Sequence, residues 1–523
     1  MSTTPRSAGR HRLAWSVAAA AMVFVSAISI SVPRAFAQTA PGADQESRRY
    51  LQILNDAFRI VLQSYVDQPD PKKLYEGAMK GLFDSLGDPY SVFLDEAMMS
   101  DMNDLATGEF GGVGLVISKQ LRDPKKPEDQ PLYVEVVSPI ENTPGWARGI
   151  LPGDLIIKIN GESTVPMLID EAQKKIRGPE GSTVVLTFRR GKGQDFDATF
   201  TRARIVLPVV KKGIIPTPKG NVAYLRIIEF TRLTKAKVEE AVREFDKAGY
   251  RGLVLDVRNN PGGLLDSAIQ VADLFLDSGV IVSTKSRLSY ENSVNRATPG
   301  TAVPADKPVI LLMNKGSASA SEILAGALKD QKRAFLMGEN SYGKGSVQQP
   351  YPIDSTGFKL TIARYYTPSD ENIDKTGIPP DLEVKEPELS EAEIGVLGKL
   401  LDSGRIEAFA AANPKAAVAD RNAFAATLSK DFALPEKVLR RLVHNELTRT
   451  TVAPDYDLEF DTALNAAIAQ LDKPGFAAEL AAAKSVKELV AAKRAADPKA
   501  AAGVAAGTAA PLPEPAPAAG PKN

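Results

Sequence analysis

Apolar residues recur every three or four positions in the first part of the chain. Leu51, Leu54, Phe58 and Val61 keep this spacing, and a second run of four apolar residues repeats it further on. This period places the apolar side chains on one face of a helix. The pattern therefore predicts a helical region over 42–100.

The pattern changes to short strands after residue 100. Runs at 132–140 and 183–191 are rich in β-branched residues, and glycine-containing turns separate them. One short helix is expected at 168–176. Short strands, tight turns and a single helix within about 90 residues are typical of a small, mostly-β module. We assign this module to 101–190.

From 205 to 385 the strands and helices alternate. The strands, such as 252–257 and 307–314, are almost continuously apolar, and amphipathic stretches at 233–249 and 264–279 follow or separate them. Uninterrupted apolar strands are typical of a sheet that is covered on both faces. The segment therefore predicts an α/β core with a largely parallel sheet and helices on both faces.

The two ends of the chain have compositions of their own. Residues 386–497 are alanine-rich and helical in pattern, whereas 498–523 are of low complexity and predicted to be disordered. At the other end, arginines precede the apolar stretch Leu13–Val32, and Ala35-Phe36-Ala37 matches a cleavage site. A signal peptide over 1–37 would export the chain to the periplasm or cell envelope. An uncleaved membrane anchor is the alternative, since the apolar stretch approaches the length that spans a bilayer.

The composition excludes several kinds of chemistry. The chain has no cysteine, and its 64 lysines and arginines balance 64 aspartates and glutamates. Disulfides, thiolate metal sites and cysteine nucleophiles are therefore excluded, and no overall charge indicates a nucleic-acid partner. Loss of the signal peptide would leave His444 as the only histidine. It falls on a predicted amphipathic helix, so we expect neither a paired-histidine metal site nor a Ser-His-Asp triad, and no metal or cofactor.

The stretch "NKGSASASEI" at 314–323 joins a predicted strand to a predicted helix. Sites form at the carboxyl ends of parallel strands, and a helix start offers unpaired N–H groups to an oxyanion. The corner therefore suits a nucleophilic serine, although its three serines are not distinguished by position. The structural alternative is a capping box from Ser319 to Glu322, worth about 1 kcal/mol.

Without a suitable histidine, the candidate base is a lysine. Lys344 lies between two glycines just beyond the next predicted strand, and burial there would favour its neutral amine. If the chain is extended, Lys344, Ser346 and Gln348 share a face, so Gln348 could orient the amine. Asp330 is about 16 Å along the helix from Ser319, which is too far for that role. A surface lysine in a glycine turn is the alternative.

A second glycine turn completes the candidate site. The strand over 252–257 is followed by Pro261, Gly262 and Gly263, where substrate could approach the main chain closely. The N–H of Gly262 or Gly263 would then form an oxyanion hole with the N–H of Ala320. A plain turn is the structural alternative.

Four stretches together resemble the carboxyl-terminal processing peptidases, also called tail-specific proteases, of serine peptidase family S41. They are "GSASASEILAGALKD", "GKGSVQQ", "DVRNNPGGLL" and "GILPGDLIIKING", and the resemblance covers about 42–390. The resemblance implies Ser319 as nucleophile, Lys344 as general base and Gln348 as the residue that orients it. One departure is Ser369-Asp370-Glu371, where the family usually has a Ser-Gly-Arg-type turn.

The resemblance also implies that the module at 101–190 is a PDZ domain inserted before the protease core. Its turn Gly112-Val113-Gly114-Leu115 would bind the terminal carboxylate of a substrate, and the neighbouring strand would pair with the peptide by β-augmentation. Arg177, at the end of the PDZ helix, is a candidate for coupling peptide arrival to the active site.

These features predict an exported serine endopeptidase that cleaves proteins near their C-terminus. Its partners would be proteins with accessible C-termini, with an activating adaptor left open, and the N-terminal helices would cap the core or form a homo-oligomer. A PDZ scaffold without catalysis is one alternative. A nucleotide-binding P-loop at Gly338–Lys344 is another, but Gly345 replaces the Ser/Thr that should bind Mg²⁺.

Overall fold

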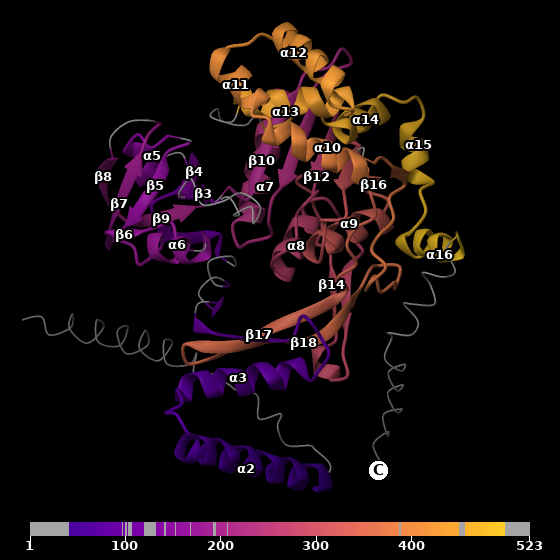
Figure 1. Cartoon of the computed structure of the whole chain (residues 1–523). Coiled ribbons are helices and arrows are strands. Elements are labelled where there is room, and N and C mark those ends of the chain that lie inside the picture. Colours follow the sequence, from indigo (N-terminus) through magenta and orange to yellow (C-terminus); the bar gives the residue numbers. More distant parts are fainter. Residues whose placement is uncertain are drawn as a thin grey trace, which may run out of the picture. The chain divides into compact units, whose positions relative to one another are not determined.

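A computed structural model describes residues 41–496, apart from 97, 100–101, 103–106, 120–131, 141–142, 152, 168, 192–194, 207, 386–388 and 449–454. The described chain forms two compact units, one up to Gly87 and one from Asp88 onward (Figure 1). The predicted signal peptide and C-terminal tail lie outside the described residues. Within the described part, no helix is both long and apolar enough to cross a membrane.

The first unit consists of helices α2 (Pro41–Ser64) and α3 (Pro71–Asp84). Asp70 caps α3 by accepting the Lys72 N–H at 2.8 Å, and proline occupies the first helical position, where its missing N–H costs nothing. The periodic apolar side chains of α2 remain exposed, Leu51 by 66% and Leu54 by 54%. The pattern thus predicts the helices correctly but not their exposure.

The predicted helical region ends earlier than residue 100. Val92–Leu94 form strand β1, which pairs antiparallel with β18 (Thr356–Tyr366). Phe93 and Leu94 are buried there. Three residues are too few to show a strand period, and the partner strand lies far away in the sequence.

The PDZ-like module contains a twisted antiparallel sheet with strand order β3-β4-β5-β7-β8 (Figure 1). In β7 every second residue is buried, so Val184, Leu186 and Phe188 form the inner face. The predicted helix is observed as α6. The elements are β2 (Glu109–Gly112), β3 (Leu115–Ser118), β4 (Val134–Pro139), α5 (Pro144–Ala147), β5 (Leu155–Ile159), β6 (Glu162–Ser163), α6 (Ile169–Ile176), β7 (Thr183–Arg189), β8 (Asp195–Thr201) and β9 (Ala203–Val206).

The α/β core is built on a six-stranded sheet with order β10-β11-β12-β15-β16-β19. All pairs are parallel except β10 with β11. Every residue of β12, β15 and β16 is buried, as their continuous apolar sequences predict. The strands are β10 (Val210–Ile215), β11 (Val222–Ile227), β12 (Gly252–Asp256), β15 (Val309–Met313), β16 (Ala334–Gly338) and β19 (Leu382–Glu383).

The helices between these strands cover one face of the sheet. They are α7 (Thr234–Ala248), α8 (Leu265–Asp273) and α9 (Ala320–Asp330), whose apolar residues share a core with Leu253 and Leu255. Because the parallel strands follow one another in a single direction, right-handed crossovers place all three helices on the same side.

The opposite face is covered from elsewhere, which corrects the expected arrangement. Val254 and Ile310 point to that side and pack against α14 (Thr462–Leu471) and α15 (Phe476–Ala481) of the C-terminal region. The prediction of two covered faces is therefore confirmed, but the second cover does not come from the alternating helices.

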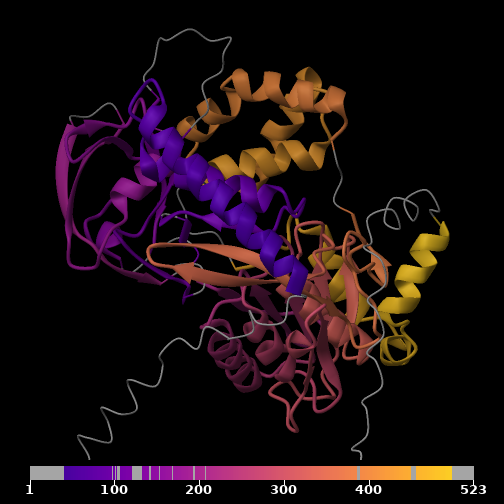
Figure 2. The ribbon, with the colours of Figure 1, turned by 90° about the horizontal axis from the view of Figure 1, so that it is seen from below.

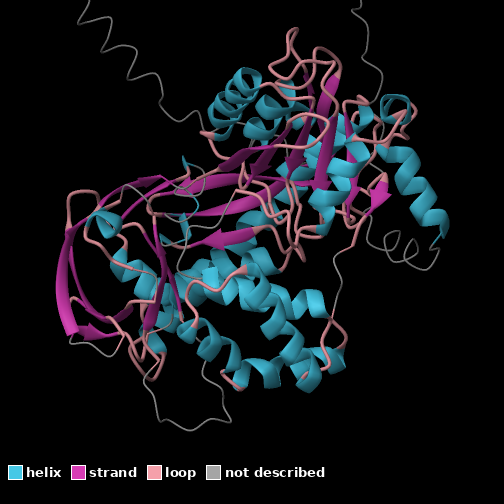
Figure 3. Ribbon diagram, turned by 90° about the horizontal axis from the view of Figure 1, so that it is seen from above, coloured by secondary structure: helices cyan, strands magenta, loops and turns pink. Residues whose placement is uncertain are grey.

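A second, antiparallel sheet contains β1, β13 (Val280–Lys285), β14 (Ser293–Arg296), β17 (Ser346–Ile353) and β18. Strands β13 and β18 thus belong to this sheet and not to the parallel one. Strands β17 and β18 form a long hairpin, which is labelled in Figure 1 and drawn in orange in Figure 2, whereas Figure 3 shows all strands in magenta. A short 3₁₀ helix, Ser289–Glu291, lies between β13 and β14.

The predicted C-terminal helices are present. Four of them share a small core around Leu400, Leu428 and Val443, whereas the last helix, α16 (Val486–Ala496), packs against the α/β core. The four are α10 (Glu391–Asp402), α11 (Arg405–Ala412), α12 (Val418–Asp431) and α13 (Glu436–Thr448).

Candidate active site

Three serines lie in the turn between β15 and α9, and their hydrogen bonds distinguish them. The Ser317 hydroxyl is buried and donates to the Val257 carbonyl at 2.7 Å, and the Ser321 hydroxyl donates to the Asn260 carbonyl at 2.9 Å. Ser319 is only partly buried and its hydroxyl makes no capping hydrogen bond. The two outer serines therefore hold the turn, while the middle hydroxyl remains available.

The backbone of Ser319 has an unusual conformation. Its φ is +53° and its ψ is −113°, a region that non-glycine residues rarely adopt. Such conformations persist when the surrounding structure determines them, and they are concentrated at functional sites. Here the bonds of Ser317 and Ser321 on either side supply that constraint.

Lys344 lies in the loop after β16, and its side chain is half-buried. Burial is the main cause that lowers the pKa of Lys344, and the positive charge of Lys359 acts in the same direction. Asp88 and Glu322 oppose this by favouring the charged form. The pKa of Lys344 is thus shifted in the direction that a general base requires, and the side chain is half-buried.

The Lys344 amine is directed at an aromatic ring. Its Nζ lies 4.7 Å from the centre of the Tyr90 ring, a distance at which a cation is attracted to the ring face. Burial and Tyr342 raise the pKa of Tyr90 to about 12, so the phenol stays neutral. Among the described residues, Lys344 Nζ makes no hydrogen bond to Ser319.

Glu322 connects the serine turn to the lysine loop. Its fully buried carboxylate accepts the N–H of Ser319 at 2.8 Å, of Gly343 at 2.7 Å and of Lys344 at 2.9 Å, and the Ser341 hydroxyl at 2.6 Å. Burial raises its pKa, while these donors pull in the opposite direction. The sequence indicated only the contact with Ser319, as part of a capping box. The bonds to the lysine loop could not be read from it.

Gln348 is the third residue of the predicted alternating face, after Lys344 and Ser346. Its Nε2 donates to Ser346 Oγ at 2.9 Å and to Thr361 Oγ1 on β18 at 3.3 Å. Ser346 and Gln348 are therefore together, as predicted. Within the described chain, no hydrogen bond joins Gln348 to Lys344, which precedes the strand.

The glycine turn after β12 reaches the serine. A Cβ built on Gly262 would lie 2.9 Å from Ser319 Cβ and 3.0 Å from the Ala320 nitrogen, so only glycine fits there. The Gly262 N–H already donates to Asn260 Oδ1 at 2.9 Å. Of the two glycines that the sequence left open, Gly263 is the one whose N–H has no acceptor among the described residues. The Ala320 N–H likewise has none there.

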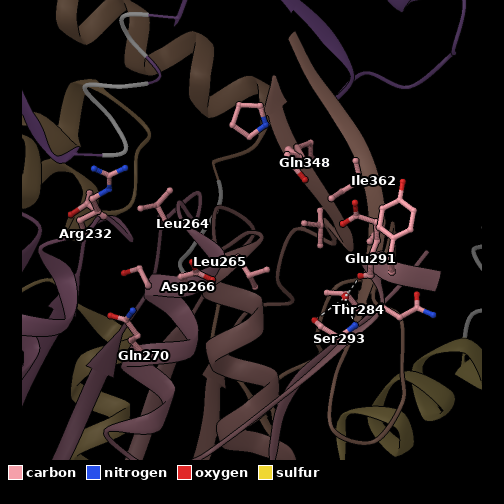
Figure 4. Close-up of a pocket in the computed structure, with 18 residues that line it drawn as sticks. Arg232, Leu264, Leu265, Asp266, Gln270, Thr284, Glu291, Ser293, Gln348 and Ile362 are labelled. Carbon is pink, nitrogen blue, oxygen red and sulfur yellow. Dashed lines mark hydrogen bonds between the residues drawn. The ribbon is translucent and has the colours of Figure 1, made fainter. Parts of the chain in front are cut away.

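A cavity of 650 Å³ begins beside this turn (Figure 4). Leu264 and Leu265 at the start of α8 border it on one side, and Gln348 and Ile362 border it on the other. Ser267 Oγ is buried at its wall without a hydrogen-bond partner. Polar side chains also line it: Thr231, Arg232, Asp266, Gln270, Thr284, Glu291 and Ser293.

The predicted carboxylate-binding turn of the PDZ-like module is tightly packed. Gly114 has φ +74°, and a Cβ there would lie 2.2 Å from Thr143. The carbonyl groups of Val113 and Gly114 accept N–H groups of Gly145 at 2.7 Å and Ile140 at 2.8 Å. These bonds fix the turn between Gly112 and Leu115 at the start of β3, and α6 packs against β3.

Arg177 lies immediately after α6, as predicted. Its guanidinium carbon is 4.3 Å from the centre of the Phe110 ring on β2. Arg177 thus contacts the strand that leads into the carboxylate-binding turn.

The other candidates have structural positions. His444 lies on α13, where it contacts Arg421 and the Phe460 ring. Asp330, rejected as a third catalytic member, accepts N–H groups of Ser369 at 2.8 Å and Val486 at 2.7 Å. The described residues contain no group of three or more His, Cys, Asp or Glu that could hold a metal ion. A strand follows the P-loop-like stretch, where a nucleotide site needs a helix.

Family comparisons agree with this arrangement. Peptidase family S41 matches residues 221–384, a PDZ domain matches 135–190, and the N-terminal domain of the activating protease CtpB matches 18–98. The fold and the site thus define a serine protease with an attached PDZ domain.

Similar whole proteins give the assignment within that class. A carboxy-terminal-processing protease of Bartonella bacilliformis is 40% identical over 66% of this chain and 77% of its own length. The carboxy-terminal processing protease CtpB of Bacillus subtilis is 34% identical over 66% of this chain and 70% of its own. The chain belongs to the carboxy-terminal processing proteases of peptidase family S41.

Among solved structures, this chain is similar to a photosystem II D1 C-terminal processing protease, which is 28% identical over 63% of this chain and 92% of that chain, with a TM-score of 0.38.

Proposed function

We propose that this protease cleaves exported proteins near their C-terminus by means of Ser319 and Lys344. Ser319 has the free hydroxyl group of the turn. Lys344 is a half-buried lysine whose backbone N–H is bound by Glu322, as is the backbone N–H of Ser319. The observation that carries the proposal is this shared anchoring of a free hydroxyl and a desolvated lysine. Desolvation supplies the neutral amine that a general base needs.

In the proposed reaction, the neutral Lys344 amine takes the Ser319 proton as the oxygen attacks the scissile carbonyl. The oxyanion accepts hydrogen bonds from the Ala320 and Gly263 N–H groups. The lysine then gives its proton to the leaving amine, and water hydrolyses the acyl-enzyme in a second, equivalent step.

The amine has to leave the Tyr90 ring before this reaction starts. A cation is favoured over an aromatic ring, so the described position suits the charged, resting form of Lys344. Gln348, held by Ser346 and Thr361, would orient the amine once it turns toward Ser319.

The cavity beside Gln348 provides room for substrate side chains. Its wall combines Leu264, Leu265 and Ile362 with polar groups, so it suits an unstructured chain that presents apolar residues. The PDZ domain would hold the substrate terminus at Gly112–Leu115, with Arg177 and Phe110 relaying that contact.

The remaining sequence features support two further proposals, one on the location of the protein and one on its assembly. The arginine-flanked apolar segment and cleavage pattern within 1–37 support export to the periplasm or cell envelope, or attachment to the membrane. Proteins with accessible C-termini would be the substrates. The match to an activating-protease N-terminal domain at 18–98 is compatible with an adaptor, and we propose a homo-oligomer formed through the N-terminal helices.

The test is cleavage of an unstructured protein with an apolar C-terminus, without ATP. Ser319→Ala and Lys344→Met should each lower kcat by at least about a thousandfold, since each removes one member of the proposed pair. Binding of the substrate C-terminus, measured by fluorescence anisotropy, should persist in both variants. Full turnover in either variant would refute the assignment. A wild-type chain that binds C-termini without cleaving anything would support a PDZ scaffold instead.

A further inference from the structure

The last helix, α16, packs against the helix that begins at the nucleophile. Val486 and Val490 are fully buried in the same core as the inner face of α9. The Val486 N–H also donates to Asp330, the last residue of α9, at 2.7 Å. The helix lies outside residues 221–384, where the chain matches the S41 family.

The far end of α16 contacts two loops near the lysine. Lys493 Nζ donates to Asn340 Oδ1 at 2.8 Å and to the Thr376 carbonyl at 3.1 Å. Arg494 pairs with Glu371 at 2.8 Å. Asn340 precedes Lys344 in the loop after β16, and its Nδ2 donates to the same Thr376 carbonyl at 3.0 Å.

The loop that contains Thr376 is packed directly against the backbone beside Lys344. The Lys375 N–H donates to the Gly343 carbonyl at 2.8 Å, and the Gly345 N–H donates to Asp374 Oδ1 at 3.0 Å. A Cβ on Gly343 would lie 2.8 Å from the Gly377 nitrogen. The two loops are therefore in contact on both sides of the lysine, and neither can shift without moving the other.

We propose that α16 positions the catalytic lysine, with Lys493 and Arg494 as its positioning residues. This inference rests on the proposed function, because it takes Lys344 as the base. The helix fixes the 371–377 loop, and this loop fixes the backbone on either side of Lys344. The carboxyl-terminal region thereby gains a catalytic purpose that its sequence did not indicate.

Loosening the loop would change the surroundings of the amine. The charged and titratable groups around Lys344 are Asp88, Tyr90, Glu322, Lys359, Tyr365 and Asp374. If the loop moves outward, water reaches the amine and the desolvation that lowers its pKa is reduced. The proton that blocks the base would then be lost only at higher pH, so activity would require more alkaline conditions.

The experiment uses the full chain and the double variant Lys493→Met/Arg494→Met. The control, Lys484→Met/Lys487→Met, removes two positive charges from exposed side chains at the other end of α16. A charge-preserving swap, Lys493→Arg/Arg494→Lys, tests rescue. We would measure kcat and KM against pH, together with thermal stability and peptide binding to the PDZ domain.

The double variant should lose about tenfold in kcat at neutral pH, with KM within about twofold and its rate profile moved to higher pH. The control should match the wild type, and the swap should recover most of the activity. Unchanged kcat in the double variant would overturn the inference, as would a loss with an unshifted profile and a lowered melting temperature. If Lys344→Met stays active, the proposed dyad itself is wrong, which is a distinguishable result.

Discussion

At the scale of single residues, hydrogen bonds decide which groups remain free to react. The hydroxyl groups of Ser317 and Ser321 donate hydrogen bonds to the carbonyl groups of Val257 and Asn260. The hydroxyl group of Ser319, which lies between them, does not. An alternation of small residues thus serves two purposes in one turn: the outer hydroxyl groups build it, and the middle one is presented by it.

Two charged residues near Lys344 shift its pKa in opposite directions, and removing each charge gives an opposite prediction. Lys359 lowers the pKa of Lys344, so Lys359→Gln should raise that pKa and move the rising limb of the kcat profile to higher pH. Asp88 favours the charged amine, so Asp88→Asn should move the limb to lower pH. Rates measured from about pH 5 to 10 on one unstructured substrate test both shifts. Shifts of the same sign in both variants would contradict Lys344 as the titrating base.

Part of this site could be predicted from sequence at the residue scale. Ser319, Lys344 and the glycine turn stand next to recognisable strand ends, so local pattern and family resemblance locate them. Tyr90 could not be found, because only the pairing of β1 with β18 brings it to the lysine. The second role of Glu322 was hidden for the same reason: its donors come from a loop that folds back onto α9.

At the scale of elements, the turn before β3 is a part of the PDZ domain that a single methyl group can disturb. Gly114→Ala would place Cβ 2.2 Å from Thr143, whereas Gly161→Ala, at a similar φ of +85°, meets nothing within 4 Å. Both carry the cost of a left-handed alanine, about 1 kcal/mol. Only the first should weaken binding of a free C-terminal peptide, by about tenfold or more.

Peptide titration and thermal melts of both variants check this expectation. A carboxyl-amidated peptide provides the matched ligand, since it lacks the charge that the turn would bind. Equal affinity of Gly114→Ala and Gly161→Ala for the free-acid peptide would exclude Gly112–Leu115 as the carboxylate site.

The same scale shows which features of the fold a linear pattern conveys. The apolar strands β12, β15 and β16 were recognisable because both of their faces are buried. Strands β13 and β18 belong to another sheet, since pairing is decided by the path of the chain and not by composition. The sequence likewise did not show that α14 covers the other face of the sheet, because the helices between the strands all lie on one side.

For the whole molecule, the exposed apolar side of α2 is the feature that predicts assembly. A helix that buries nothing of its own is marginal in water, and contact with a second copy would stabilise it. The exposed large apolar residues on and just after α2 are Tyr50, Leu51, Ile53, Leu54, Ile60, Val61, Tyr65 and Val66. We expect the wild-type chain to be at least dimeric.

Leu51→Glu/Leu54→Glu should convert the oligomer to monomers, measured by light scattering after size-exclusion chromatography. The control, Gln52→Glu/Asn55→Glu, adds the same charge at exposed polar positions of the same helix and should leave the mass unchanged. An unaltered mass in the leucine variant, or a monomeric wild type, would contradict assembly through α2.

The shared carboxylate of Glu322 has one further consequence. The buried Glu322 carboxylate binds the main chain of both Ser319 and Lys344. A displacement of either residue would therefore displace the other. A signal that reaches the lysine loop from any direction is thereby transmitted to the serine. In the proposed mechanism, Ser319 and Lys344 would therefore become active or inactive together, and no state would have one of them in place without the other.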